Sequence, residues 1–244
     1  MFSYYGSKSK LAALYPAPES PTVIEPFAGS ARYSLLHWRH SVKLYDIFPL
    51  IVDLWTYLMG VTEDEILGLP DIPSKVNIDT FDLTPIQKTL IGFHLCRGKA
   101  KPRKVGHGQN GWSRDKERIA SSLYKIRHWG IEQKDYREIP NEEATWFIDP
   151  PYQTVCTKAN GDRYPHSEID YQELAEWTRS RRGQVIVCEG EGANWLPFKP
   201  FKTINGNTNN RTVKRSVEMV YLDRPLKTPD ASEAMKKNEG NTAT

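Results

Sequence analysis

The fold is decided by the stretch Thr22-Val23-Ile24-Glu25-Pro26-Phe27-Ala28-Gly29-Ser30-Ala31. Its first six residues have the mainly apolar character of a short buried strand. The small residues that follow predict a tight turn, which leads into a helix over about 31–40. A strand, a tight turn and a helix in this order are the opening unit of an α/β sheet.

The next predicted strand, 42–46, ends in an acidic residue. Asp46 follows Gly29 by 17 residues, and a helix over 49–59 comes after it. In nucleotide-binding α/β folds an acid ~20 residues after the glycine turn holds ribose hydroxyls, so Asp46 is a candidate for that role. The chain lacks Gly-x-Gly-x-x-Gly at this turn, which disfavours a pyrophosphate cradle and therefore NAD or FAD.

The second half of the chain continues the α/β pattern. The stretches 131–136, 145–148 and 184–188 predict parallel strands, and 171–179 predicts a helix between the last two. The alternation over 217–222 indicates an edge strand.

The middle of the chain interrupts this pattern with helical patterns near 84–96 and 115–129. We therefore predict a discontinuous core over 1–59 and 131–225 and an insertion over 60–130. The polar residues 226–244 have little to bury, which predicts a disordered tail.

Composition indicates a cytoplasmic protein without membrane contact. No apolar run approaches the ~20 residues of a membrane span, and the amino terminus lacks the pattern of a secretory signal. The cysteines, Cys96, Cys156 and Cys188, are widely spaced and odd in number. They indicate reduced thiols, with neither a disulfide framework nor a metal site.

A basic loop within the insertion suggests a polyanionic partner. Residues 97–104 contain five basic side chains and no acid. Such side chains can neutralise nucleic-acid phosphates, and polar or aromatic residues just beyond them can reach bases. A solvated loop is the alternative, and Arg211, Lys214 and Arg215 form a smaller second strip. The candidates in the insertion are Arg97, Lys99, Lys101, Arg103, Lys104, Asn110, Trp112 and Arg114.

The tetrapeptide Asp149-Pro150-Pro151-Tyr152 follows the predicted strand 145–148 and is the clearest functional signal. In parallel α/β sheets ligands bind beyond the carboxyl ends of the strands, where this turn is expected. The prolines fix the backbone and leave carbonyls free as acceptors. A carboxylate, a free carbonyl and an aromatic face suit a planar amino group, such as that of a nucleobase. An ordinary proline turn is the alternative.

These motifs together resemble the DNA adenine methylase family of N6-adenine methyltransferases. The resemblance rests on the order and spacing of Tyr4-Tyr5-Gly6-Ser7-Lys8, Glu25 to Ser30, Asp46, Asp135-Tyr136 and Asp149 to Tyr152. It implies a Rossmann-like methyltransferase sheet with a small, mainly helical target-recognition insertion. It also implies the cofactor S-adenosyl-L-methionine, double-stranded DNA as substrate and no metal.

The resemblance also implies residue roles. Tyr4, Lys8, Glu25 and Asp149 would lie against the cofactor, with Lys8 able to meet its carboxylate. Phe27 and Gly29 would let the backbone approach the methionine part. Asp46 would hold the ribose, and Asp135 and Tyr136 would lie beside the cofactor's adenine. Asp149 to Tyr152 would hold a target adenine that has been flipped out of the duplex. Ser7 and Ala31 depart from the family pattern, because glycine is frequent at both positions.

Three alternatives stay open at this point. The target could be RNA or the amino group of cytosine, because Asp-Pro-Pro-Tyr does not distinguish these substrates. The chain could also be a cofactor-binding regulatory module that has lost catalysis. The target sequence, a protein partner and any role for Glu189 and Glu191 cannot be read from the motifs.

Overall fold

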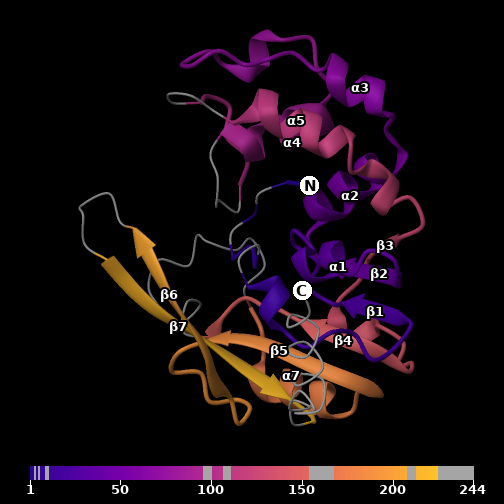
Figure 1. Ribbon diagram of the computed structural model, residues 1–244, viewed down its shortest axis with the longest axis vertical. Coiled ribbons are helices and arrows are strands. Elements are labelled where there is room, and N and C mark those ends of the chain that lie inside the picture. Colours follow the sequence, from indigo (N-terminus) through magenta and orange to yellow (C-terminus); the bar gives the residue numbers. More distant parts are fainter. Residues whose placement is uncertain are drawn as a thin grey trace, which may run out of the picture.

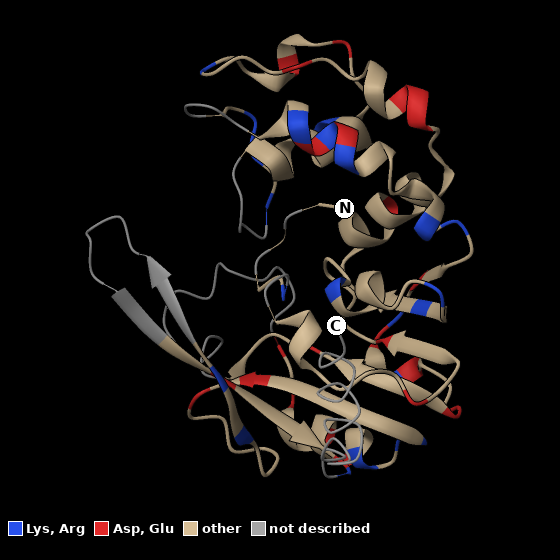
Figure 2. Cartoon of the chain, viewed as in Figure 1, with Lys and Arg blue, Asp and Glu red and all other residues tan. Residues whose placement is uncertain are grey.

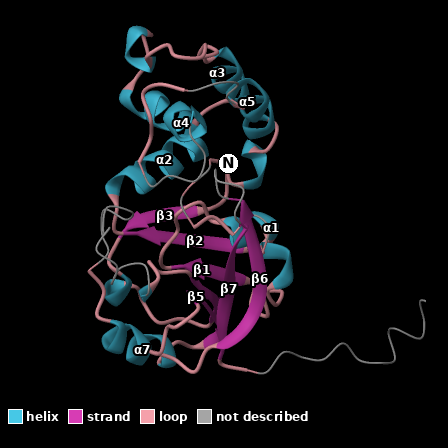
Figure 3. Cartoon of the chain, turned by 90° about the vertical axis from the view of Figure 1, so that its left-hand side faces the viewer, coloured by secondary structure: helices cyan, strands magenta, loops and turns pink. Residues whose placement is uncertain are grey.

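The computed structural model describes residues 1–2, 4, 6–8, 11–95, 101–106, 111–153, 168–207 and 213–224. Its centre is a seven-stranded sheet with the order β3-β2-β1-β4-β5-β7-β6 (Figures 1 and 3). The strands are β1 (Thr22–Glu25), β2 (Ser41–Asp46), β3 (Gly130–Gln133), β4 (Ala144–Ile148), β5 (Gly183–Gly190), β6 (Lys199–Asn207) and β7 (Val213–Leu222).

Strands β1 to β5 are parallel and follow the 3-2-1-4-5 order of a doubly wound sheet. Strand β7 runs antiparallel to both of its neighbours, β5 and β6. The predicted α/β, Rossmann-like fold class is therefore confirmed by the strand order.

The prediction of an edge strand at 217–222 was wrong. Strand β7 begins earlier, at Val213, and is paired on both sides, while the outer position belongs to β6. Sequence reasoning missed β6, because Lys199-Pro200-Phe201-Lys202 has no clean alternation and contains proline. Proline and lysine are tolerated in an edge strand, where one side of the backbone needs no partner.

Helices cover both faces of the sheet. The helices are α1 (Arg32–Leu36), α2 (Pro49–Gly60), α3 (Glu63–Gly68), α4 (Pro85–Leu95), α5 (Trp112–Ala120) and α7 (Tyr171–Arg179). Short 3-10 helices lie at η1 (Ala12–Leu14), η2 (Ile78–Thr80), η3 (Leu123–Lys125) and η4 (Tyr136–Glu138). Among these residues no helix is long and apolar enough to cross a membrane.

Adjacent strand residues point into two separate cores, as the alternation of side chains along a strand requires. Val23 and Phe147 belong to the cluster that includes residues of α1 and α2. Their neighbours Ile24 and Trp146 belong to the other cluster, with Leu174 of α7. The central strands are thus buried on both faces, which explains their apolar sequences.

The segment between α2 and β3 forms a helical lobe above the sheet in Figure 1. Its buried residues, such as Leu90 and Trp112, belong to the same apolar cluster as α2. Helix α5 ends at Ala120, although a helix was expected over 115–129. The hydroxyl of Ser121 donates to the carbonyl of Arg118, and serine competes in this way with helical hydrogen bonds.

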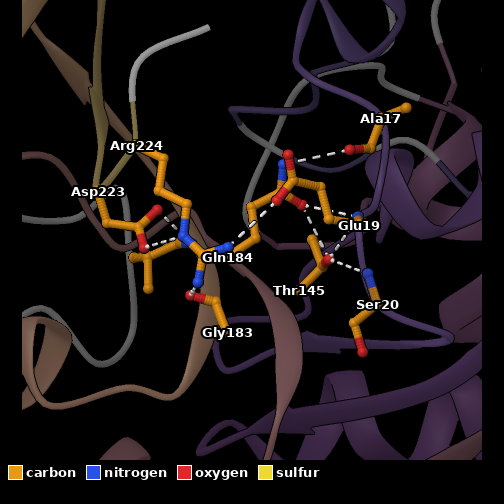
Figure 4. Close-up of polar contacts among 9 residues, drawn as sticks. Ala17, Glu19, Ser20, Thr145, Gly183, Gln184, Asp223 and Arg224 are labelled. Carbon is orange, nitrogen blue, oxygen red and sulfur yellow. Dashed lines mark hydrogen bonds and ion pairs between the residues drawn. The ribbon is translucent and has the colours of Figure 1, made fainter. Parts of the chain in front are cut away.

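At the amino ends of β4 and β5 the neutral side chains of Thr145 and Gln184 join the strands to the segment before β1, next to the charged residues Glu19, Asp223 and Arg224 (Figure 4). The hydroxyl of Thr145 donates to Oε1 of Gln184 at 2.8 Å and accepts from the amides of Glu19 and Ser20. Oε1 of Gln184 also accepts from Glu19, and its Nε2 donates to the carbonyl of Ala17. This hydrogen-bond network holds this end of the sheet together, and the cavity described below lies at the opposite end.

Candidate active site

A cavity of about 730 Å³ opens beyond the carboxyl ends of β1, β2 and β4. Its volume falls within the ~300–1,000 Å³ that small-ligand sites occupy. Strand order reverses between β1 and β4, and such a switch point is where doubly wound sheets bind ligands. The lining includes every residue that the sequence predicted as a cofactor contact: Tyr4, Lys8, Glu25, Phe27, Gly29, Asp46, Asp135, Tyr136 and Asp149.

The turn after β1 is shaped by Gly29. Its φ of +42° lies in the left-handed region, and a Cβ at this position would lie 3.3 Å from the ring of Tyr4. Nε1 of Trp55 donates to the Gly29 carbonyl at 2.9 Å, which ties the turn to α2. The backbone can therefore approach a ligand closely only because this residue has no side chain.

Asp46 connects the turn after β1 with the start of α2. Its Oδ2 accepts from the amide of Gly29 at 3.0 Å, and its Oδ1 accepts from the amide of Phe48 at 2.9 Å. Both carboxylate oxygens of Asp46 therefore act as hydrogen-bond acceptors at this edge of the sheet. Asp46 is both a structural tie and a half-buried wall of the cavity.

Lys8, Asp149 and Glu218 form a buried charged cluster at the cavity. Nζ of Lys8 lies 2.8 Å from Oδ1 of Asp149 and 3.5 Å from Oε1 of Glu218. The side chains of Lys8 and Glu218 are only 6% and 7% exposed, and that of Asp149 is 21% exposed. With both carboxylates ionised, these side chains carry a net charge of −1.

Burial sets the protonation behaviour of this cluster. It raises the pKa of Asp149 to about 6; Lys8 opposes this rise and Glu218 adds to it. Burial also disfavours the charged form of Lys8, but Asp149 and then Glu218 outweigh it, so the pKa of Lys8 is raised. Near neutral pH the pair is therefore an ammonium next to a carboxylate.

Tyr152 lies behind the cavity wall, within reach of the same cluster. Its hydroxyl donates to Oε1 of Glu218 at 2.6 Å, and the ammonium of Lys8 lies 4.7 Å from the centre of its ring. Pro151 lines the cavity, and its carbonyl accepts from the hydroxyl of Tyr171. Pro150 is buried in the same turn. The tetrapeptide is thus held on both sides by α7 and β7.

Glu25 and Asp135 have strong local partners. Oε1 of Glu25 accepts from the amide of Ser34 at 2.8 Å, and burial raises the pKa of Glu25 to about 8. Asp135 caps the short helix η4 and binds the guanidinium of Arg137 at 2.7 Å. Phe27 and Tyr136 pack together, with ring centroids 5.7 Å apart, at the end of the cavity near β2 and β3.

The predicted nucleic-acid contacts have different surroundings. Lys101, Arg103, Lys104 and Arg114 are exposed, and Lys101 also lines the cavity. Lys104 is paired with Asp79 at 2.6 Å. Helix α5 carries charges of both signs (Figure 2). Arg97, Lys99, Asn110 and Arg211 lie outside the described residues, as do the side chains of Lys214 and Arg215.

Trp112 does not fit the role that the sequence suggested. Its side chain is 0% exposed, and its Nε1 donates to the carbonyl of Pro70 at 2.9 Å. Its ring also packs against His94, with centroids 5.4 Å apart. Trp112 is therefore part of the core of the insertion and does not contact a base in this structure.

Sequence reasoning missed several residues at the site, among them Glu218, Ser7 and Arg32. Glu218 lies in an alternating strand whose partner could not be read from the sequence. Ser7 and Arg32 tie the amino-terminal segment to α1, because Nε of Arg32 donates to the Ser7 hydroxyl at 3.0 Å. Ser7 thus makes a hydrogen bond that a glycine could not make. Among the described residues, no group of three or more His, Cys, Asp and Glu side chains is arranged to bind a metal.

No family model matches the chain, and no curated protein matches it in sequence. Solved structures with a similar arrangement include a geranyl diphosphate methyltransferase in complex with GPP and sinefungin, at 11% identity and a TM-score of 0.30. The match covers 74% of this chain and 42% of that one.

Two further matches act on RNA according to their names. The rRNA methyltransferase aviRa from Streptomyces viridochromogenes has 16% identity and a TM-score of 0.41, with 86% of this chain and 80% of that one covered. The Pyrococcus abyssi tRNA (uracil-54, C5)-methyltransferase in complex with S-adenosyl-L-homocysteine has 10% identity and a TM-score of 0.36. That match covers 87% of this chain and 36% of the other, so this chain spans less than half of the length of the first and third proteins.

Proposed function

We propose that this protein is an S-adenosylmethionine-dependent methyltransferase that acts on the exocyclic N6 amino group of adenine in DNA. The observation that carries the proposal is the position of Asp149. Its carboxylate follows a buried strand and faces the cavity at the switch point of the sheet. Asp46 and the Gly29 turn lie across the same cavity.

The cavity fits the proposed cofactor in chemistry as well as in size. The Gly29 turn leaves the room that a Cβ would fill, which suits the methionine part. Asp46 offers carboxylate acceptors to ribose hydroxyls, and Phe27 with Tyr136 offers an aromatic wall for a base. When bound, the cofactor would supply the methyl group. The lone pair of the amino nitrogen would form the new bond to this methyl, and the electrons of the broken carbon–sulfur bond would stay on sulfur.

Asp149 would do the main work on the acceptor. An exocyclic amine is a poor nucleophile because its lone pair is delocalised into the ring. Lys8 contacts Oδ1 of Asp149, and we assign Oδ2 to an amino hydrogen of the target. A buried carboxylate at this point stabilises the positive charge that develops on nitrogen, and it can take the proton that the nitrogen releases.

The polymer substrate is assigned from the charged residues outside the cavity. Arg103 and Arg114 are exposed on the helical lobe, and Lys101 extends the basic surface to the rim of the cavity. A base has to leave the duplex to reach Asp149, at a cost of a few kcal/mol. Phosphate contacts from these residues would offset part of that cost.

The test is transfer of labelled methyl from S-adenosylmethionine to unmethylated genomic DNA, followed by nucleoside analysis. We expect labelled N6-methyladenine with the wild-type chain and none with Asp149→Ala. Parallel reactions on total RNA and on DNA without adenine separate the other substrates. Label in RNA or in cytosine, with none in adenine of DNA, would reject the proposed substrate.

A second measurement addresses the basic residues. Arg103→Ala and Arg114→Ala should each reduce the slope of log affinity for DNA against log salt by about 1, because each removes one phosphate contact. Lys104→Ala is the matched control, since Lys104 is already paired with Asp79. An unchanged slope in both arginine variants would place the DNA surface elsewhere.

A further inference from the structure

Glu218 is a buried carboxylate beside the site that neither the motifs nor the proposed chemistry uses. Glu218 is on β7, which runs antiparallel into the sheet between β5 and β6. Its partner on β5 is Gly190, at the carboxyl end of that strand. The reversed direction of β7 therefore brings the middle of this strand to the end of the sheet where Asp149 lies.

Glu218 is held by several donors on a single oxygen. Oε1 accepts from the hydroxyl of Tyr152 at 2.6 Å and from the hydroxyl of Tyr15 at 2.9 Å. Nζ of Lys8 lies 3.5 Å from the same atom. Glu218 thus contacts the ammonium that pairs with Asp149 and the aromatic residue of the Asp-Pro-Pro-Tyr turn.

The charge count explains why a second carboxylate is useful here. Lys8 and Asp149 alone form a neutral pair, and a neutral pair attracts a positive charge far more weakly than a free carboxylate does. In methyl transfer the target nitrogen becomes positive at the transition state. Glu218 restores a net charge of −1 to the cluster in a site where burial weakens the screening by water.

We propose that Glu218 is a positioning residue that gives the cluster of Lys8, Asp149 and Glu218 its net negative charge and fixes the ring of Tyr152. The proposal rests on the proposed methyl transfer. It gives β7, which carries no recognised motif, a role in methyl transfer through the charge of Glu218.

Among the described residues, Lys8 and Glu218 are the charged groups that shift the pKa of Asp149. Burial raises the pKa values of Tyr15, Tyr152 and Cys188, so these groups are neutral at physiological pH. Burial also raises the pKa of Glu25 to about 8, and it raises the pKa of Glu189. Lys8 comes from the amino-terminal segment, Glu25 from β1, Cys188 and Glu189 from β5, and Glu218 from β7.

The test compares Glu218→Gln with Glu218→Asp and Tyr15→Phe in steady-state methyl transfer. Gln keeps an acceptor oxygen for the tyrosines but removes the charge, so we expect kcat to fall about 10- to 100-fold with KM for the cofactor within about threefold. Glu218→Asp keeps the charge and should retain more activity than Glu218→Gln. Tyr15→Phe removes one donor to the same oxygen, keeps the charge and should stay within about twofold of wild type.

The acid limb of the pH profile gives a readout that a purely structural role would not move. Glu218 adds to the raised pKa of Asp149, so its loss should move the acid limb of kcat to lower pH. Tyr15→Phe should leave the limb in place. Equal kcat in Glu218→Gln and Tyr15→Phe, or an unmoved acid limb, would overturn the inference.

A ligand-free titration separates this inference from the proposed function. The carboxyl carbon of Asp149 can be followed by NMR in wild type and in Glu218→Gln. A lower pKa of Asp149 in the variant supports the electrostatic coupling even where no substrate is methylated, whereas identical titrations reject it. Absence of methyl transfer by the wild-type chain would count against the proposed function alone.

Discussion

The two ends of β4 and β5 hold buried polar side chains in opposite ways. At the amino ends Thr145 and Gln184 are neutral, and they exchange hydrogen bonds with each other and with the backbone before β1 (Figure 4). At the carboxyl ends Lys8, Asp149 and Glu218 are charged and share one buried space with an excess of negative charge. The same strands therefore carry neutral, hydrogen-bonded side chains at their amino ends and a cluster with a net negative charge at their carboxyl ends.

This difference between the two ends suggests that one contributes mainly to stability and the other mainly to activity. A satisfied neutral hydrogen bond contributes roughly 0.5–1.5 kcal/mol to stability. Buried charges are costly to desolvate, and replacing them often leaves a protein equally or more stable. We infer that the amino-end network stabilises the sheet, whereas the charged cluster is retained for its chemistry.

The backbone shows the same contrast. At the amino end Gly183 has φ +98°, and a Cβ there would lie 2.1 Å from the carbonyl oxygen of Ala144, so only glycine fits. At the site end Ala31 has φ +42° although it carries a side chain. At the cavity the strained Ala31 comes two residues after Gly29, which shares its left-handed φ of +42°, whereas the opposite end has glycine where its backbone requires it.

Asp149→Asn should have the largest effect. It keeps the shape of the side chain but removes its charge, so we expect kcat for methyl transfer to fall about 10²- to 10³-fold. The measurement is kcat with saturating cofactor, with circular dichroism as the control for folding. Retention of more than a tenth of the activity would break the assignment of the charged end to catalysis.

The same substitution should change the pH dependence of stability in a defined direction. The pKa of Asp149 is about 6 in the folded state, above the 3.8 of an unfolded aspartate. The protonated carboxyl therefore favours folding below pH ~4, and this contribution, up to roughly 3 kcal/mol, is lost as the pH rises through 6. Asp149→Asn should not show this loss.

Urea unfolding at pH 4 and pH 7 measures that difference. Relative to wild type, the variant should gain stability between the two pH values. If the free energy of unfolding depended on pH equally in both proteins, burial would not destabilise the ionised form of Asp149. The electrostatic contrast between the two ends of the sheet would then be lost.

Gln184→Leu should have the opposite profile. The substitution removes the acceptor of the Thr145 hydroxyl and the donor to the Ala17 carbonyl, so we expect about 2–3 kcal/mol of destabilisation. For a chain of this size the melting temperature should fall by roughly 5–10 °C, with kcat within about twofold of wild type. Thr145→Val, on the strand that leads to Asp149, is the matched control. A large loss of kcat in either folded variant would mean that the two ends are coupled.

Ala31→Gly should have the smallest effect, and it should be favourable. Relief of the left-handed strain, about 1–2 kcal/mol, exceeds the 0.4–1 kcal/mol of extra chain entropy that glycine adds to the unfolded state. We expect a net gain of about 0.5 kcal/mol in urea unfolding. A loss of stability would show that the Ala31 side chain, which is buried in the main core, contributes more by packing than its backbone loses.

The local patterns were sufficient for the parallel part of the sheet. The predicted helices at 49–59 and 171–179 match α2 and α7 closely, because their ends carry local signals. Pro49 occupies the first turn of α2, and Asp170 caps α7 through the amides of Gln172 and Glu173. The 31–40 and 115–129 helices end early, and β6 was not recognised at all.

The sequence by itself determined which residues reach the cavity from β1, β2 and β4. A strand that ends in Glu25 or Asp46, or that is followed directly by Asp149, delivers that residue to one edge of a parallel sheet, whatever else the chain does. Only the tertiary structure decided that Glu218 joins Asp149 and that Trp112 turns inward. Both facts depend on contacts between segments distant in the chain, and no local pattern records which strand lies beside which.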